Sequence, residues 1–433
     1  MLFLLTALIF LVWLRYYHHG RLSLAMVEGW TLFAVFAYGF TELASSRSSI
    51  TYPTWLIGWA TFTTGLVFLA TIRFITAKDM GNRFIELGQK VLAIRHNIEI
   101  FLLICLFLVI LLIGGLRFPP NNYDSMTYHL ARVEHWITNQ NINFYSTHIT
   151  RQLYMQPLAE VLILQFRVLQ NSERVDFIVQ WFALIACLAG GWYLASTTNI
   201  NRAAPLTLLL VVTVPMAILQ ANSTQNDLLA ASWMMAAAIH TQRCIQKPSL
   251  KRYLWLGLTI GLGLLTKGTL YFLILPIPII IAGNWLINLV QRTTTLKDAL
   301  KQVSMAGLAA GLALLMNAPF YWRNMQLTHQ PIGATPEEMP YLIEMRPVFA
   351  VANLIKNTSM QLQLPFPAGN SAIAQAVVKF VQDIIGIDDI NHPAIDYNIN
   401  DQNEYGYWLN SQFNSEDIAG SPLRAVLFVF SVG

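Results

Sequence analysis

The stretch FPPNNYDSMTYHLARVEHW, residues 118–136, decides how the rest of this chain is interpreted. It follows an apolar run, Ile98–Leu116, that is long enough to cross a bilayer. Polar, aromatic and ionisable side chains continue through STHITRQLYMQPLAE, residues 146–160, and the stretch ends at Leu169. Only 12% of the chain is charged and 55% is hydrophobic. Such a concentration therefore indicates a functional ledge at a membrane surface, and we call residues 118–169 the ledge.

The composition is that of an all-α polytopic membrane protein. The chain has 433 residues and a mean hydropathy of +0.48, and its apolar runs recur near the length of about 20 residues that a spanning helix needs. We expect about 10 to 11 transmembrane helices. The predicted spans are 2–14, 24–43, 54–76, 98–116, 176–196, 203–220, 227–243, 253–266, 268–288 and 302–318, with a further one from Pro422.

The basic residues predict the orientation. Lys and Arg gather in alternate connections, for example at Arg15, between Arg73 and Arg95, and between Arg243 and Arg252. The positive-inside rule places these connections in the cytoplasm. The ledge within loop 117–175, the turn STQND (residues 223–227), Lys267 and loop 319–420 then share the opposite face. We therefore expect an integral plasma (inner) membrane protein with an extracytoplasmic site.

Several function classes are disfavoured. No basic, aromatic-interleaved patch stands clear of the apolar segments, so we expect no nucleic-acid partner. The three cysteines lie in or at the ends of predicted spans, which disfavours a disulfide framework. The nine histidines show no zinc-binding spacing. We expect no cofactor and no tightly bound metal, and leave open a loosely bound divalent cation.

The ledge itself is predicted to contain interfacial helices. Met126, Leu130, Val133 and Ile137 recur at helical spacing, so residues 124–138 indicate an amphipathic helix. Asp124 is then either the N-cap of this helix, a general base, or both. The following segment, 157–169, is expected to pack back against the membrane.

Other isolated polar residues have a structural and a functional interpretation. Asp227 is a helix cap or a binding residue, and Lys267 is the only charge between Arg252 and Arg292. Lys267 either snorkels to the interface or fixes a lipid phosphate at headgroup depth. Arg323 beside Tyr321 and Trp322 is an interfacial anchor or a phosphate ligand. Arg132 and Arg151 either bind phosphate bidentately or solvate the ledge.

The chain is expected to divide into four parts. Residues 1–97 hold N-terminal spans and a cytoplasmic connection, and residues 98–318 form a transmembrane core with the catalytic loop 117–175. Residues 319–420 form a small extracytoplasmic region, acidic and without Lys or Arg between Asp383 and Asp417, with weak helices near 347–356 and 371–386. Residues 421–433 begin a further span that is too short to cross, which suggests truncation.

Three stretches resemble the polytopic glycosyltransferases with the C-type fold. The branch most similar holds the protein O-mannosyltransferases and the lipid A aminoarabinose transferase. The stretches are the ledge with its element LYMQPLAEVLI (153–163), the lysine turn within GLGLLTKGTLYFLILP (261–276), and NAPFYWRNMQLTHQPIG (317–333). Together they extend the resemblance over about residues 98–335.

The resemblance implies transfer of a sugar, with inversion, from a polyprenyl-phosphate donor to an acceptor hydroxyl or amine-bearing molecule on the extracytoplasmic face. By this analogy Asp124 is the catalytic base and Lys267 neutralises the lipid phosphate, with Arg323 as a helper. Asp227 positions the acceptor or sugar. Arg132, Arg151, Tyr128, His129 and Tyr154 complete the expected substrate-binding set. The resemblance leaves the acceptor open among a glycan, a lipid and a protein.

The sequence departs from the family pattern in two places, and two rival functions stay open. Ser125 follows Asp124 where the family has an acidic pair, which bears on the acceptor class. Residues 1–76 add spans that the family core does not need, and an oligomer or partner contact is their simplest role. The first rival function is a transporter or flippase of lipid-linked saccharides without chemistry, and the second is an assembly protein.

Overall fold

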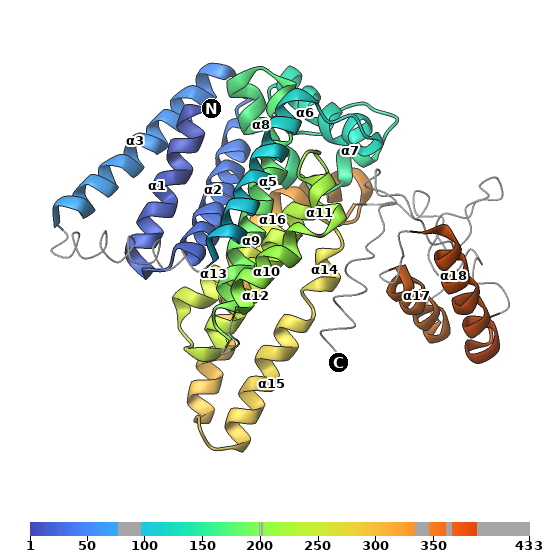
Figure 1. Cartoon of the computed structure of the whole chain (residues 1–433). Coiled ribbons are helices and arrows are strands. Elements are labelled where there is room, and N and C mark those ends of the chain that lie inside the picture. Colours follow the sequence, from blue (N-terminus) through green and yellow to red (C-terminus); the bar gives the residue numbers. More distant parts are fainter. Residues whose placement is uncertain (77–96, 199, 201, 334–345, 361–365, 388–433) are drawn as a thin grey trace. The chain divides into compact units, whose positions relative to one another are not determined.

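The computed structural model describes residues 1–76, 97–198, 200, 202–333, 346–360 and 366–387 (Figure 1). Regular structure in these residues is entirely helical, which confirms the predicted all-α class. The chain packs as two units. The first comprises residues 1–211 and 220–333, and the second comprises residues 212–219 and 334–433. Each unit is described by itself.

The helices of the first unit run in chain order. They are α1 (Leu2–His19), α2 (Leu22–Ser45), α3 (Tyr52–Thr76), α5 (Ile98–Arg117), η2 (Ser125–His129), α6 (Leu130–Asn139), α7 (Arg151–Tyr154), α8 (Leu158–Gln170), η3 (Glu173–Val175), α9 (Ile178–Ala195), α10 (Ala203–Val212), α12 (Asp227–Gln246), α13 (Leu250–Leu264), α14 (Leu270–Leu273), α15 (Pro276–Val290) and α16 (Leu296–Thr328).

Seven helical segments among the described residues are long and apolar enough to cross a membrane: Leu2–His19, Leu22–Ser45, Tyr52–Thr76, Ile98–Arg117, Glu173–Ala195, Leu270–Val290 and Leu296–Thr328. The predicted spans 227–243 and 253–266 are helical, as α12 and α13, but do not belong to this set.

The predicted span 203–220 is wrong as one continuous helix. Helix α10 ends at Val212, and α11 (Pro215–Gln220) begins only after a break. Pro215 has no backbone N–H and its ring crowds the preceding turn, so a helix that reaches residue 214 cannot continue unchanged. The predicted span 268–288 is confirmed as the apolar helical segment Leu270–Val290, within which α14 ends at Leu273 and α15 begins at Pro276.

Aromatic packing places α2 at the centre of the first unit. Trp30 of α2 stacks on Trp233 of α12 with ring centroids 6.0 Å apart. Phe33, one turn on, lies 5.0 Å from the Trp59 ring of α3 and 6.4 Å from the Phe166 ring of α8. These five side chains are fully or almost fully buried. The N-terminal helices therefore contribute to the core that supports the ledge, in addition to any partner contact.

A charged cluster joins α1, α2 and α12 at the far end of this packing. The Glu28 carboxylate is fully buried. It accepts hydrogen bonds from Arg15 Nε at 2.6 Å and from Arg243 Nη1 at 2.6 Å, and His19 Nε2 lies 2.9 Å away. Removing one partner of such a buried pair leaves an uncompensated charge, which costs about 3–5 kcal/mol. The cluster therefore fixes the N-terminal helices to the rest of the unit.

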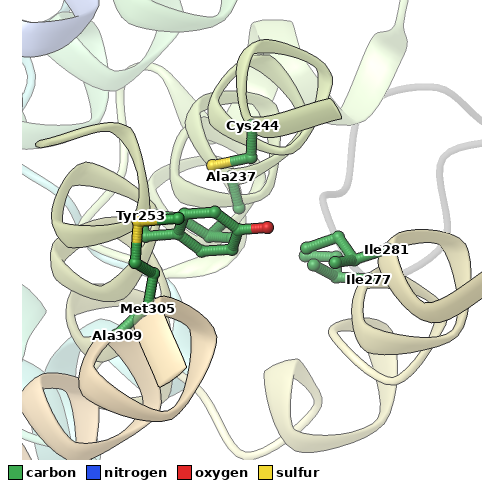
Figure 2. Close-up of a cluster of buried hydrophobic side chains, with 8 residues drawn as sticks. Ala237, Cys244, Tyr253, Ile277, Ile281, Met305 and Ala309 are labelled. Carbon is green, nitrogen blue, oxygen red and sulfur yellow. The ribbon is translucent and has the colours of Figure 1, made fainter. Parts of the chain in front are cut away.

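Small residues bring α13 and α16 into close contact. A Cβ atom on Gly257 would lie 2.5 Å from the Ala309 carbonyl oxygen, so only glycine fits there. Asn317 of α16 donates from Nδ2 to the Gly261 carbonyl at 3.0 Å. A buried apolar cluster continues from this contact, and Figure 2 shows the Tyr253 hydroxyl pointing toward Ile277 of α15. This packing sets the position of the lysine turn at the end of α13.

Helix α8 departs from its predicted place. Residues 158–167 of α8 are all buried, and the helix contacts α2, α3, α6 and α9. Gln165 accepts from Trp59 Nε1 at 3.1 Å and donates to Thr41 Oγ1 at 2.9 Å. The expectation that this segment packs back against the membrane is therefore wrong, because its apolar side chains are covered by protein on every side.

The second unit contains short helices. These are α11, α17 (Pro347–Met360), α18 (Pro367–Phe380) and η4 (Val381–Ile385). Ala352, Val381 and Ile387 form a small buried cluster. The predicted helices near 347–356 and 371–386 are confirmed, while the predicted span from Pro422 lies outside the described residues.

Candidate functional site

The cap of the ledge helix lies two residues earlier than predicted. Tyr123 and Asp124 are already helical, and the Asn122 side-chain oxygen accepts from the Ser125 backbone N–H at 2.7 Å. Asn122 is therefore the cap, and the prediction that Asp124 caps the helix is wrong. The Asp124 side chain makes no capping hydrogen bond. Residues 125–129 form a π-helical turn, a feature frequent at functional sites.

The Asp124 carboxylate lies at the surface beside a cation. Arg151 Nη1 is 4.0 Å from Asp124 Oδ1, and the two side chains are 40% and 32% exposed. The same guanidinium lies over the Tyr128 ring, 5.7 Å from its centroid. Tyr128 itself is buried. Asp124, Arg151 and Tyr128 thus form one group in which the carboxylate keeps access to solvent.

Asp227 and Lys267 form a second group. Lys267 Nζ donates to Asp227 Oδ1, and Gln220 Nε2 donates to Asp227 Oδ2 at 3.0 Å. Lys267 and Asp227 remain 29% and 45% exposed. The lysine turn is itself held, because Asn226 Nδ2 donates to the Thr266 carbonyl at 3.1 Å. The Lys267 ammonium group is therefore held in one orientation by Asp227 and remains accessible to solvent.

Hydroxyl contacts tie the two groups together. Thr224 Oγ1 donates to Ser125 Oγ at 2.7 Å, and Asn122 Nδ2 donates to Ser223 Oγ at 2.6 Å. Ser125 follows Asp124 in the chain, and Thr224 lies three residues before Asp227. The pKa of Tyr128 is raised by burial and then by the negative charges of Asp124, Glu160 and Asp227. One side chain thus experiences carboxylates from both groups.

The loop before α8 also reaches the lysine turn. The Leu158 backbone N–H donates to the Leu265 carbonyl at 2.9 Å. A Cβ atom on Gly268 would lie 3.5 Å from the Gln156 side chain, so Gln156 packs directly against the residue after Lys267. The ledge and the lysine turn are therefore in contact from both sides. Asp124 and Lys267, which the sequence predicted to share a site, thus lie on segments that contact each other.

Beneath this site lies a buried polar cluster of His129, Glu160 and Arg132. His129 Nδ1 is 2.7 Å from Glu160 Oε1, and Arg132 Nη1 is 3.8 Å from the same oxygen. Burial alone would raise the pKa of Glu160. The hydrogen bond from His129 and the charge of Arg132 outweigh burial and lower it below its ordinary value of 4.5. Burial lowers the pKa of Arg132, and the Glu160 charge opposes that effect.

Arg132 differs from its predicted placement. Its guanidinium is 3% exposed and donates from Nη2 to the carbonyls of Leu153 at 2.9 Å and Met155 at 2.8 Å. It also lies over the Trp136 ring, 4.9 Å from the centroid. The sequence suggested that Arg132 binds phosphate or solvates the ledge. Its guanidinium instead donates hydrogen bonds to backbone carbonyls that follow Arg151.

Arg323 is likewise engaged. It donates from Nη1 and Nη2 to both Glu42 oxygens, at 2.8 and 2.7 Å. The neighbouring Asn324 donates to the Tyr154 carbonyl at 3.3 Å. Arg323 and Tyr154 therefore lie on the side of the site nearest α2 and α16, whereas Lys267 lies beside α12.

Sequence reasoning missed the roles of Glu42 and Asn122, and it included Ser223 and Thr224 only as part of a polar turn, without their partners. Glu42 could have been noticed as a carboxylate in an apolar helix. The others are ordinary loop residues whose partners are about 100 residues away, and no local pattern reveals such contacts. In the part of the chain that the structure describes, no three His, Cys, Asp or Glu side chains gather as metal ligands.

The described part of the chain has the fold of an all-α polytopic membrane protein. Residues 157–322 match the family model of dolichyl-phosphate-mannose-protein mannosyltransferases. This match confirms the resemblance drawn from the sequence and is consistent with a membrane glycosyltransferase of the C-type fold. It includes Glu160, Asp227, Lys267 and nearly all of α16. No curated protein and no solved structure matches the chain.

The buried Glu160 predicts an acid-dependent stability. Its lowered folded-state pKa contributes stability that is fully present above 4.5 and is lost as the pH falls through the folded pKa. Glu160→Gln should therefore lower the free energy of unfolding by about 3 kcal/mol at pH 7, because Arg132 loses its counter-charge. The deficit should narrow below pH 4.5.

Thermal unfolding of the purified protein between pH 3 and 7 measures this difference. Glu99→Gln, which changes an exposed carboxylate at the start of α5, is the matched control and should change little at any pH. A deficit for Glu160→Gln that stays constant across the whole pH range would contradict the assignment.

Proposed function

We propose that this protein transfers a sugar from a polyprenyl-phosphate donor to an acceptor on the extracytoplasmic face, with inversion at the anomeric carbon. The family match supports a membrane glycosyltransferase of the mannosyltransferase type. The observation that carries the finer proposal is the pairing of two exposed ion pairs, Asp124–Arg151 and Asp227–Lys267, around one buried tyrosine. A base and two cations within one site are the groups that such a transfer requires.

The reaction needs one proton acceptor. The acceptor oxygen attacks the anomeric carbon on the face opposite the phosphate, and the bond from that carbon to the phosphate oxygen breaks. The electron pair of the broken bond leaves with polyprenyl phosphate, while the proton of the acceptor hydroxyl passes to Asp124. Asp124 suits this role because no cap consumes its carboxylate and its partner Arg151 stands 4.0 Å away.

The leaving phosphate needs fixed positive charge. Lys267 and Arg151 are the exposed cations of the site, and both are oriented before substrate arrives, by Asp227 and by Tyr128 respectively. Preorganised charges of this kind stabilise a developing anion without reorganisation at the moment of reaction. In this proposal Asp227 holds Lys267 and offers its second oxygen to a sugar or acceptor hydroxyl.

The remaining predicted binding residues take supporting roles in the proposal. Arg132 holds the carbonyls that follow Arg151, and His129 fixes the segment below Tyr128 through Glu160. Arg323 is neutralised by Glu42 and anchors α16 to α2. Tyr154 shapes the loop before α8. The extracytoplasmic orientation, and a place in the plasma membrane, rest on the distribution of Lys and Arg.

Asp124→Asn tests the base. The change keeps size and polarity but removes proton affinity, so the transfer rate should fall by about 10²–10⁴-fold. Reconstituted protein is supplied with a panel of radiolabelled polyprenyl-phosphate sugars and envelope extract as acceptor source. Release of polyprenyl phosphate is measured, and Asp298→Asn, an exposed carboxylate at the start of α16, serves as control.

Near-normal turnover of Asp124→Asn would remove Asp124 from the reaction. Donor that crosses the vesicle membrane unaltered, with no release of polyprenyl phosphate by the unmodified protein, would instead favour the transporter or flippase.

Lys267→Ala tests the phosphate site. Loss of the ammonium leaves Asp227 to repel the donor, so the dissociation constant for polyprenyl phosphate should rise about tenfold or more, a change of about 1.4 kcal/mol. Lys267→Arg keeps the charge and should stay near the original affinity. Titration of the purified variants measures this, and an unchanged affinity for Lys267→Ala would refute the role.

A further inference from the structure

A cavity of about 500 Å³ lies apart from the residues described above. Its walls are the turn at residues 50–52 between α2 and α3, one face of α6, the end of α8 and residues 171–173. The volume falls within the range of small-ligand sites. None of Asp124, Arg151, Asp227 or Lys267 lines it.

One wall of the cavity is negatively charged. Arg167 is bound through Nε to the buried Asp176 at 3.0 Å, and its Nη1 also contacts Glu134. Glu173 stands 4.0 Å from the same guanidinium. Asp176 is buried, does not line the cavity and neutralises Arg167 from behind, whereas Glu134 and Glu173 line the cavity and are 53% and 68% exposed. This wall favours a cationic ligand and disfavours phosphate or carboxylate.

The other walls offer neutral polar groups and an aromatic face. Thr51 and Ser172 contribute hydroxyls, and Asn171 contributes an amide that can both donate and accept. Tyr52, the first residue of α3, is 53% exposed and presents a flat apolar ring. A sugar ring has one apolar face of C–H groups and a rim of hydroxyls, so it matches this combination of groups.

The cavity is connected to the proposed catalytic residue by one helical run. Glu134 of α6 lies ten residues after Asp124, and η2 and α6 are continuous. At 1.5 Å per residue, the two carboxyl-bearing positions are about 15 Å apart along the helix. The cavity and the proposed catalytic residue therefore belong to one continuous helical element.

We propose that this cavity binds an amine-bearing sugar unit of the acceptor. Glu134 and Glu173 receive the ammonium group and hydroxyls, and Tyr52 stacks on the apolar face of the ring. The assignment of this sugar to the acceptor rests on the proposed transferase function, whereas the binding of the sugar to the cavity does not. The subsite deepens that function by naming the chemical class of the acceptor.

The test compares two disaccharides that differ only in charge. Titration calorimetry of the full chain uses β-1,4-linked glucosamine disaccharide and its N,N′-diacetyl form. The free-amine form should bind with a dissociation constant of about 1 mM or tighter, and the acetylated form at least tenfold more weakly. Equal affinity for both, or no binding of the free-amine form, would overturn the proposal.

Two variants locate the binding. Glu173→Gln and Tyr52→Ala change exposed side chains, so the protein should keep its fold. Each should weaken the free-amine disaccharide at least fivefold, while Glu99→Gln leaves its affinity unchanged. If both cavity variants bind as tightly as the unmodified protein, the disaccharide occupies another place and the proposal fails.

The proposed subsite and the proposed transferase function can be rejected independently of each other. Asp124→Asn should leave disaccharide affinity unchanged, because Asp124 does not line the cavity. Full transfer activity of Asp124→Asn would reject the catalytic proposal with the subsite intact. Absence of disaccharide binding in an active transferase would reject the subsite alone.

Discussion

One hydrogen bond, from the Thr224 hydroxyl to Ser125, joins segments separated by 99 residues. It places the start of the ledge helix, which follows Asp124, beside the turn that leads into α12, whose first residue Asp227 pairs with Lys267. Both hydroxyls are buried, so losing either partner would leave an unsatisfied polar group, at a cost of about 1–3 kcal/mol. The candidate site depends on this contact because neither segment carries all the groups the proposed reaction needs.

The supporting structure explains why the ledge needs protein around it. Polar loop residues at a membrane surface have few apolar contacts of their own, and α8 supplies a fully buried floor beneath them. Trp30 and Phe33 of α2 pack against α12, α3 and α8. Glu42 of the same helix holds Arg323 of α16. The N-terminal helices are thus part of the frame that positions the site.

Much of the fold follows from the sequence, because apolar length predicts helices that cross a membrane. Lys267 was noticed as an isolated charge in an apolar stretch and Asp124 as part of the polar ledge, and the site roles of both stay predictions. Long-range contacts were harder to foresee. The Asn122 cap replaced Asp124, Pro215 divided a predicted span, and the carbonyls of Leu153 and Met155 engaged Arg132. The cap and the partners of Arg132 are set by how the chain folds. The break at Pro215 is caused by a single residue, which an average of hydropathy over a window does not detect.

The contact between Ser125 and Thr224 tests the shared site most directly. Their hydroxyl oxygens are 2.7 Å apart, so Ser125→Cys with Thr224→Cys should form a disulfide under mild oxidation. The experiment replaces Cys105, Cys187 and Cys244 first and uses Ser125→Cys with Thr259→Cys as the control pair. We predict crosslinking of the first pair alone in folded protein. No crosslink in the first pair, or equal crosslinking in both, would contradict a single site built from the ledge and the lysine turn.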